Sequence, residues 1–373
     1  METVSVNLGS RSYPIRIGHG ILANFGAAYV DRGLGKSAAI VTNPTVAAHY
    51  LEPVRNSLSA AEVQVTVVTM PDGEAYKTLE TAGTMCGDLI RAGLDRGSCI
   101  VALGGGVVGD TAGFVAATYL RGIDFVQVPT TLEAQVDASV GGKTAVDHPL
   151  GKNIIGAFHQ PRMVYIDTDT LRSLPRREMA AGMTEVIKHG LIRDPELVAC
   201  LEEKLEALVD LKVAPEEIDG LIAQNCRIKA GVVEADETEA GLREILNYGH
   251  TVGHAIEVVT DYRVYRHGEA VRLGMLAAGK IALDKGFWRG ADFQRQNALI
   301  RRLGVPEGAE HLNVNRLLER MESDKKARSG VIRFVLPEAI GRAVSCDTVT
   351  RCEMGAGIRY MQRYSAEEGQ ELI

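Results

Sequence analysis

The histidines in the second half of the chain carry a clear signal for chemistry. In 247-NYGHTVGHAIE-257, the residues His250, His254 and Glu257 stand at positions i, i+4 and i+7. On an α-helix this spacing places the three side chains on one face, where two imidazoles can bind one divalent metal ion. Helical histidines that only make hydrogen bonds are more common, so this segment alone leaves both interpretations open.

Two other segments add candidate ligands in an apolar helical context. They are 182-GMTEVIKHG-190 and 266-RHGEA-270. A site of two histidines and one carboxylate keeps coordination positions open, which is typical of a catalytic rather than a structural zinc ion. The three segments together therefore favour a catalytic metal centre.

A glycine-rich run points to a second kind of ligand. The run 104-GGGVVGD-110 follows a buried-strand pattern and opens a helix. Glycines there let a pyrophosphate approach backbone N–H groups at a helix N-terminus. A tight strand-to-helix turn without a ligand is the alternative, because the usual dinucleotide fingerprint lies in the first crossover of a domain. Asn43 and 72-DGEAYK-77 also follow strand patterns, and parallel strand ends meet at one ligand-binding edge.

A group of basic residues stands beside glycine, small or apolar residues rather than in a charged surface stripe. Each one alone is readily explained as a solvated side chain. Together with Asn153 they could line an anion pocket for a phosphate and a carboxylate. The basic residues are Arg121, Lys143, Lys152, Lys188, Lys229 and Arg243.

The elements that must position these residues change in character near Pro175. Before it, short β-branched runs at 38–43, 63–70, 99–105, 125–130 and 163–167 alternate with helical patterns, which predicts a parallel sheet. After it, longer helical periods dominate at 195–209, 215–233 and 291–304, and one strand-like run follows at 331–337. We therefore predict an α/β fold with a Rossmann-like parallel-sheet domain over 1–175 and a mainly α-helical domain over 176–373.

Composition restricts the class of protein further. The 373 residues hold 41 Lys and Arg against 48 Asp and Glu, a net charge of −7 that argues against a broad nucleic-acid surface. The six cysteines form no C-x-x-C pair and the first residues lack a signal-peptide layout, so we expect a cytoplasmic protein. No apolar stretch is long enough for a transmembrane helix, and we expect no membrane partner.

Several long motifs, in this order, closely resemble the 3-dehydroquinate synthase family. They are 104-GGGVVGD-110, 121-RGIDFVQVPTTLEAQVDASVGGKTAVDHPLGKN-153, 182-GMTEVIKHG-190, 236-DETEAGLREILNYGHTVGHAIE-257 and 267-HGEAV-271. The resemblance runs from Asn43 to 324-DKK-326. It implies a phosphorus–oxygen lyase that converts 3-deoxy-D-arabino-heptulosonate 7-phosphate to 3-dehydroquinate and phosphate. This reaction belongs to the shikimate pathway, which leads to the aromatic amino acids.

The same resemblance implies the reaction course and the cofactors. The steps are transient NAD-dependent oxidation, phosphate elimination, reduction and intramolecular aldol closure, so that NAD is not consumed. The family uses a divalent metal, usually zinc or cobalt, and generally forms homodimers. The substrate is a small sugar phosphate.

Individual residues acquire expected roles from the matching motifs. The metal ligands would be Glu185, His250 and His267. The NAD site would contain Asn43, Asp72, Gly73, Glu74, Ala75, Tyr76, Lys77, Gly105, Gly106, Val107, Val108, Gly109, Asp110, Thr130, Thr131, Lys143, Lys152, Thr170, Leu171, Arg172 and Ser173. Substrate binding and catalysis would involve Asp137, Lys143, Lys152, Asn153, Lys188, Lys229, Arg243, Asn247 and His254, with Lys325 or Lys326 from a late segment and Arg121 from the neighbouring subunit.

Two departures and three alternatives remain. Asp147 stands where the family commonly shows Asn, and His189 stands where Tyr is usual. A sister sugar phosphate cyclase would differ in the GGKTAV and HPLGKN segments. A metal-dependent polyol dehydrogenase would consume NAD and would not need so many cations. A non-catalytic NAD-sensing module would not need Glu185, His250 and His267 together.

Overall fold

The computed structural model describes residues 1–327 and 332–370, which fall into two compact units. One unit contains Met1–Pro175 and Val213–Thr238, and the other contains Arg176–Lys212 and the described residues from Glu239 onward. The predicted division into 1–175 and 176–373 is therefore wrong for one helix, α7 (Pro215–Ala235), which belongs to the first unit. The physical reason is burial: its apolar side chains, among them Ile218 and Ile222, cover the strands β1 and β2.

The first unit is built on a seven-stranded sheet with the order β1-β2-β9-β6-β5-β3-β4. Only β1 runs antiparallel to its neighbour, and the other pairs are parallel, so the predicted parallel sheet is confirmed. Its strands are β1 (Glu2–Val6), β2 (Tyr13–Gly18), β3 (Ser37–Thr42), β4 (Gln64–Thr69), β5 (Cys99–Gly104), β6 (Asp124–Pro129) and β9 (Met163–Asp167).

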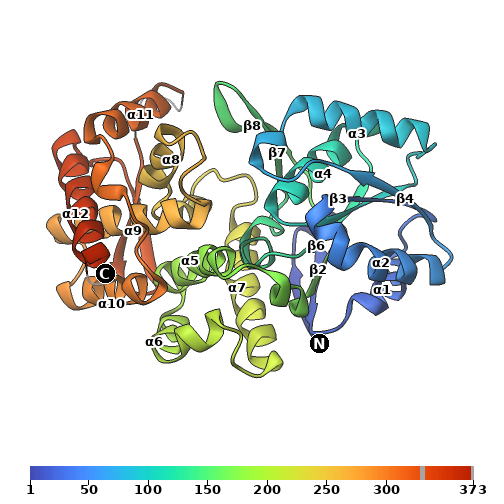
Figure 1. Cartoon of the computed structure of the whole chain (residues 1–373), viewed down its shortest axis with the longest axis horizontal. Coiled ribbons are helices and arrows are strands. Elements are labelled where there is room, and N and C mark those ends of the chain that lie inside the picture. The colour runs from blue at the N-terminus through green and yellow to red at the C-terminus, as the bar shows by residue number, and fades with distance from the viewer. Residues whose placement is uncertain (328–331, 371–373) are drawn as a thin grey trace. The chain divides into compact units, whose positions relative to one another are not determined.

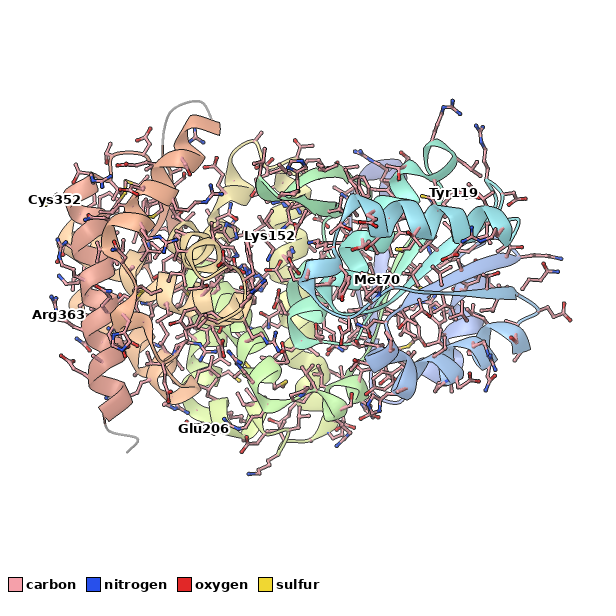
Figure 2. The ribbon with its side chains drawn as sticks, turned by 45° about the horizontal axis from the view of Figure 1, so that its top comes forward. Met70, Tyr119, Lys152, Glu206, Cys352 and Arg363 are labelled. Carbon is pink, nitrogen blue, oxygen red and sulfur yellow. The ribbon has the colours of Figure 1, made fainter. Side chains whose placement is uncertain are left out.

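Helices cover both faces of this sheet, as Figure 1 shows for α1 to α4. Alternate residues of β3 point to opposite sides: Ile40 packs in the cluster with α1 (Phe25–Asp31) and α2 (Pro44–Ala60). Val41 packs in the cluster with α3 (Leu79–Arg91) and α4 (Gly106–Thr118). Met70 and Tyr119, labelled in Figure 2, belong to this second cluster. Burial on both faces explains why the inner strands β3 and β5 are nearly continuous apolar runs rather than alternating ones.

Shorter elements complete the first unit. A hairpin of β7 (Lys143–His148) and β8 (Gly151–Phe158) follows the π-helical turn Ala134–Ala138. The 3₁₀ turns are η1 (Gly9–Arg11), η2 (Leu22–Asn24), η3 (Glu74–Tyr76), η4 (Tyr119–Arg121) and η6 (Thr168–Ser173).

The second unit is mainly helical, with α9 (His267–Asp284) at its centre. This helix packs against α5, α8, α10, α12 and β10, and 13 of its residues are buried. A helix buried nearly all round marks the middle of a core. The other elements are α5 (Arg176–Arg193), α6 (Pro195–Val209), η7 (Leu242–Asn247), α8 (His250–Val259), α10 (Gly290–Leu303), η8 (Ala309–His311), α11 (Val314–Ala327), β10 (Phe334–Ala339), β11 (Arg342–Cys346) and α12 (Arg351–Gln370).

The late strand-like run is an antiparallel hairpin rather than part of the main sheet. β10 pairs with β11 and packs on α9. In the described part of the chain, no helix has both the length and the apolarity needed to cross a bilayer.

Candidate active site

Three imidazoles of the second unit meet at one point. His250 and His254 lie one turn apart on α8, and His267 begins α9. One ligand atom of each lies within 4.8 Å of the others, and no other such group of metal-ligating side chains occurs among the described residues. His250 is buried whereas His254 is exposed, so a ligand can approach the group from the side of His254.

Hydrogen bonds fix the tautomers of two of these rings. The Nδ1 of His250 lies 3.1 Å from the carbonyl oxygen of Tyr248, and the Nδ1 of His267 lies 3.2 Å from the Oε1 of Glu257. A carbonyl or carboxylate oxygen accepts, so each Nδ1 carries the proton and donates. The Nε2 lone pairs are thereby left for a metal ion, which is the usual arrangement of a metal-binding histidine.

Electrostatics keeps His250 in the form that binds metals. Burial, aided by the nearby Lys188, His267 and His254, holds the pKa of His250 well below its usual value. The ring is therefore neutral near pH 7. A neutral imidazole can donate its lone pair to a cation.

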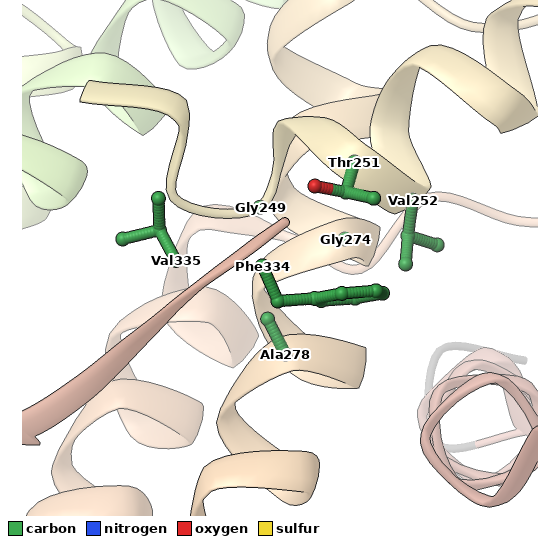
Figure 3. Close-up of a pocket in the computed structure, with 7 residues that line it drawn as sticks. All are labelled: Gly249, Thr251, Val252, Gly274, Ala278, Phe334 and Val335. Atoms are coloured by element: carbon green, nitrogen blue, oxygen red, sulfur yellow. The ribbon is translucent and has the colours of Figure 1, made fainter. Parts of the chain in front are cut away.

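Glycines bring α8 and α9 into close contact. Gly249, which precedes α8, has a φ of 80°, a left-handed conformation that suits glycine. A Cβ at Gly274 would overlap the carbonyl oxygen of Gly249. Figure 3 shows both residues beside a small hollow lined by Thr251, Val252, Ala278, Phe334 and Val335. The two helices that carry the histidines are thus held backbone to backbone.

Glu185 and Lys188 form a buried ion pair on α5. Each side chain is only 1% exposed, and Lys188 Nζ contacts Glu185 Oε2. A buried carboxylate is costly unless a cation balances it. Lys188 is close enough to His250 to lower the pKa of that imidazole, so the ion pair lies near the three histidines.

The predicted ligand set and the observed cluster differ in one member. Glu185 was predicted as the third ligand and His254 as a substrate residue, whereas the close group consists of His250, His254 and His267. The assignment of Glu185 as a metal ligand stays a prediction. In this structure the Glu185 carboxylate is paired with the Lys188 ammonium.

Two predicted substrate residues lie on η7, just before α8. Arg243 is buried, with 1% exposure. The Nδ2 of Asn247 donates to Glu239 Oε1 at 2.9 Å. Glu239 was not predicted, because nothing in 236-DETEAG-241 distinguishes it from a solvated acidic loop.

The predicted NAD residues of the first unit gather at one edge of its sheet. Each group follows the carboxyl end of a parallel strand: Asn43 after β3, Asp72 after β4, Gly105 after β5, Thr130 after β6 and Thr168–Ser173 after β9. In the sheet, β4 lies on one side of β3 and β5 lies on its other side, so the direction of the strand order reverses at β3. Ligands of open α/β sheets bind at this kind of switch point.

Local bonds shape the edge between β3 and β5. Asn43 Oδ1 caps α2 by accepting from the N–H of Val46 at 2.8 Å, and its Nδ2 donates to Asp72 Oδ1 at 2.9 Å. Gly105 is the N-cap of α4. A Cβ at Gly109 would lie 2.7 Å from the Oε1 of Gln127, so this glycine lets α4 pack closely on β6.

A polar network surrounds Lys77, which is also at this edge. Lys77 Nζ donates to Asp110 Oδ2 at 2.6 Å and to Asn153 Oδ1 at 2.5 Å. Burial would lower the pKa of Lys77, but Asp110 and Glu74 hold it above its usual value, so the ammonium stays charged. Lys152, labelled in Figure 2, pairs with Glu74 at 2.8 Å.

Asp147 strengthens the same network. Its Oδ1 accepts from the N–H of Asn153 at 2.8 Å, and its own N–H donates to the carbonyl of Lys77 at 2.7 Å. Burial raises the pKa of Asp147. Through its Oδ1, the Asp147 side chain supports the backbone of the predicted substrate residue Asn153. His189, the other departure from the family pattern, is fully buried on α5.

Lys229 and Asp137 form a second pair in the first unit. Lys229 on α7 contacts the Asp137 carboxylate and donates to the Asp137 carbonyl at 2.5 Å. Lys229 also acts electrostatically on Asp110, which connects this pair with the network around Lys77. This contact joins α7 to the turn Ala134–Ala138 of the same unit.

Several other predicted residues have distinct surroundings. The hydroxyl of Thr170 accepts from Gln135 and donates to the carbonyl of Asp167, and Leu171 lies in the core, so neither side chain points to solvent. Val108 is also a core residue.

Among the predicted basic residues, Arg121 and Lys143 are exposed. The side chains of Lys325 and Lys326 lie outside the described residues.

Comparison with known proteins agrees with this geometry. Residues 67–181 match the model of the 3-dehydroquinate synthase N-terminal domain, and residues 182–327 match that of the C-terminal domain. The 3-dehydroquinate synthase of Pelotomaculum thermopropionicum is 54% identical over 345 residues, which cover 92% of each chain.

Two solved structures share the fold at 26% identity. One is a 2-deoxy-scyllo-inosose synthase complexed with carbaglucose-6-phosphate, NAD⁺ and Co²⁺, with a TM-score of 0.86 over 96% of this chain and 99% of that one. The other is a 2-epi-5-epi-valiolone synthase from Streptomyces hygroscopicus with NAD⁺ and Zn²⁺ bound, with a TM-score of 0.88 over 96% and 98%. Sequence, fold and site agree, and the chain belongs to the 3-dehydroquinate synthase family.

Proposed function

We propose that this chain is an enzyme that converts 3-deoxy-D-arabino-heptulosonate 7-phosphate to 3-dehydroquinate and phosphate, and that it acts as a phosphorus–oxygen lyase. The observation that carries the proposal is the group of three imidazoles, two of them with Nδ1 held by a hydrogen bond. The relative with 54% identity supports the same reaction. The shikimate pathway and the synthesis of aromatic amino acids follow from that reaction.

A divalent metal, zinc or cobalt, would be held by Glu185, His250 and His267. Two imidazole donors and one carboxylate suit such an ion, and the hydrogen bond at each Nδ1 leaves the two Nε2 atoms for it. The structural relatives with bound Co²⁺ and Zn²⁺ support this choice. His254, on the exposed side of the group, is then placed to contact the substrate.

NAD⁺ would lie at the switch point between β3 and β5. Asn43 and Asp72 offer polar groups on one side of this point, and the N-terminus of α4 at Gly105 favours a pyrophosphate on the other. Two structural relatives contain NAD⁺. When bound, NAD⁺ supplies reversible redox chemistry and the metal supplies Lewis-acid polarisation of the reacting oxygens.

Each unit contains side chains that we predicted to bind the anionic groups of the substrate. Lys152, Asn153 and Lys229 belong to the networks of the first unit, and Lys188 and Arg243 belong to the second. Ammonium and guanidinium groups around a phosphate stabilise the charge that develops as it leaves. The oxygens of the departing phosphate can take up the neighbouring proton, so the protein need not supply a strong base.

We further propose a homodimer in which Arg121 reaches the partner's phosphate site. Leu120 and Arg121 are exposed and have φ values of 50° and 70°, which are unfavourable for residues other than glycine. Two backbone bonds hold this turn: Gly122 N–H to Tyr119 O, and Ile123 N–H to Ala116 O, both 2.9 Å. A strained turn that presents two side chains outward is well suited to a contact between subunits.

Phosphate release from the heptulosonate phosphate, with the product identified by NMR, tests the proposal. We expect 3-dehydroquinate and phosphate in equal amounts. A different carbocycle would identify a sister cyclase, and NADH released in proportion to product would identify a polyol dehydrogenase. Binding of NAD without turnover of any sugar phosphate would identify a sensing module.

A further inference from the structure

Arg272 is a buried cation that the proposed reaction does not use. It lies on α9, five residues after His267, and is 3% exposed. Burial lowers the pKa of Arg272 to about 10, so the guanidinium remains charged at neutral pH. A buried charge persists only where the structure provides compensating polar partners.

The partners of Arg272 come from two other helices. Its Nε donates to Thr184 Oγ1 at 3.1 Å and its Nη2 donates to the carbonyl of Ala180 at 2.9 Å, both on α5. Its Nη1 contacts the carbonyls of Leu303 and Gly304, where α10 ends. The guanidinium therefore grips one turn of α5, Ala180 to Thr184, and joins it to α9 and to the end of α10.

This turn of α5 directly precedes Glu185. One helical turn before Arg272, a Cβ at Gly268 would overlap the carbonyl oxygen of Ala181, so α9 and α5 touch through backbone atoms there. Gly268 is the neighbour of His267. Positions 268 and 272 of α9 follow the proposed ligand His267. Both contact the turn of α5 that directly precedes the other proposed ligand, Glu185.

We propose that Arg272 is a positioning residue for the metal site, which fixes the backbone that carries Glu185 against the helix that carries His267. The inference rests on the proposed function, because it takes Glu185 and His267 as ligands. Gly268 sets how closely the helices approach, but a smooth backbone contact allows sliding. The guanidinium prevents the helices from sliding, because its planar fork donates to two acceptors on α5. Its Nη1 also donates to the carbonyl of Leu303 at the end of α10.

The consequence for the metal follows from geometry. A ligand set binds tightly only when its donors are held within about 0.5 Å of the required positions. Lysine at position 272 would keep the charge but could not bridge α5 and the end of α10 in one plane. Loss of such supporting contacts typically lowers metal affinity about 10- to 100-fold.

The test measures Co²⁺ binding to the full chain by competition with a chelator, together with the visible absorption of bound Co²⁺ and the thermal midpoint of the metal-free protein. The variants are Arg272→Lys and Thr184→Val, which removes one acceptor and keeps the arginine. Arg295→Met is the control, because Arg295 also joins two helices of the same unit, and both of its hydrogen bonds go to Glu202 on α6 rather than to α5 or α9.

We expect Arg272→Lys to raise the Co²⁺ dissociation constant about tenfold or more and to change the absorption spectrum. Thr184→Val should change both in the same direction by less, and Arg295→Met should leave both unchanged. Wild-type affinity and spectrum in Arg272→Lys, with or without a lower thermal midpoint, would overturn the inference and leave the proposed function standing. If Arg272→Lys does not fold, Thr184→Val with wild-type affinity and spectrum would overturn it equally. A wild-type chain that binds no Co²⁺ and no Zn²⁺ would overturn the proposed metal site itself.

Discussion

Glu257 holds the ring of His267 from a different helix, with its Oε1 3.2 Å from the Nδ1 of the imidazole. Glu257 lies on α8 and His267 begins α9, so this one contact sets both the tautomer of the ring and its direction. Glu257 is buried, which strengthens a charge-assisted hydrogen bond. A residue outside the proposed ligand set thus orients a proposed ligand.

Removal of the Glu257 carboxylate should weaken metal binding. We expect Glu257→Ala to raise the metal dissociation constant about tenfold or more, because the His267 ring loses its fixed tautomer. Glu257→Gln keeps an acceptor oxygen and should cost less. Chelator competition with Zn²⁺ measures both, and metal affinity equal to wild type in Glu257→Ala would contradict the role assigned to this contact.

Metal content separates the predicted ligands from the third imidazole. We expect His250→Ala and Glu185→Gln to lose bound metal and turnover, because each would remove one of three donors. His254→Ala should retain metal and lose activity, since His254 is proposed to contact substrate. Metal analysis of the purified variants decides the matter. Metal lost from His254→Ala and kept by Glu185→Gln would instead assign the ion to the three imidazoles.

The cofactor's role can be read from absorbance at the NADH wavelength. If the nicotinamide is restored within each turnover, NADH should appear only as a transient below the enzyme concentration. Steady accumulation that matches product formation would contradict a closed redox cycle. A glycerol-type substrate serves as the control, because a polyol dehydrogenase would oxidise it and this chain should not.

Much of the first unit could be predicted from its sequence because its strands are buried on both faces. The runs at 38–43 and 99–105 are mostly apolar, and they form β3 and β5 within a residue of the predicted bounds. The hairpin of β1 and β2 was not predicted. Its strands, such as 2-ETVSV-6, alternate only over a few residues, and β2 joins the sheet beside β9, which lies far along the chain.

Side chains that act across elements could not be placed in the same way. The helical pattern at 215–233 predicts which face of α7 is buried but not which strands cover it, and this is why α7 was assigned to the wrong unit. The spacing in 247–257 places Glu257 on the face of the histidines, but the contact with His267 depends on the turn between α8 and α9. Hydrophobic periodicity predicts which side chains are buried, whereas the residues that they contact depend on tertiary packing.

An ion pair between α6 and α10 should make the stability of the second unit pH-dependent. Glu206, labelled in Figure 2, accepts from Arg302 at 2.7 and 2.6 Å, and the Arg302 guanidinium lowers the pKa of Glu206 from 4.5 to about 2. A lowered folded-state pKa stabilises above the unfolded value, and the gain is lost as pH falls from about 4.5 to about 2.

The size of that effect is limited because Glu206 is half exposed. Solvent screening leaves about 1 kcal/mol or less for such a pair. We expect Glu206→Gln to lower the thermal midpoint by a few degrees at pH 7, and the difference from wild type to vanish near pH 2. A difference that persists at low pH would show that the pair's charge is not its cause. Added salt should shrink the difference at pH 7.

The placement of Arg121 predicts complementation between inactive subunits. Arg121 belongs to η4 of the first unit, and Lys188 belongs to α5 of the second. If Arg121 serves the partner's site and Lys188 its own, a mixed dimer of Arg121→Ala and Lys188→Ala subunits has one site with both lesions and one site with none. Each pure variant should be inactive, because an arginine fork and a buried ammonium on the substrate's anionic groups would be lost.

Mixing the two variants should therefore restore activity that neither has alone. Random reassortment makes about half of the dimers mixed, and each has one intact site of two, so the ceiling is about a quarter of wild-type activity for independent sites. Native mass spectrometry must first show that subunits exchange. An Arg121→Lys subunit in place of Arg121→Ala should give little activity as a pure variant, because an ammonium cannot bind two phosphate oxygens in the fork geometry. No recovery after proven exchange would place Arg121 at a site in its own subunit.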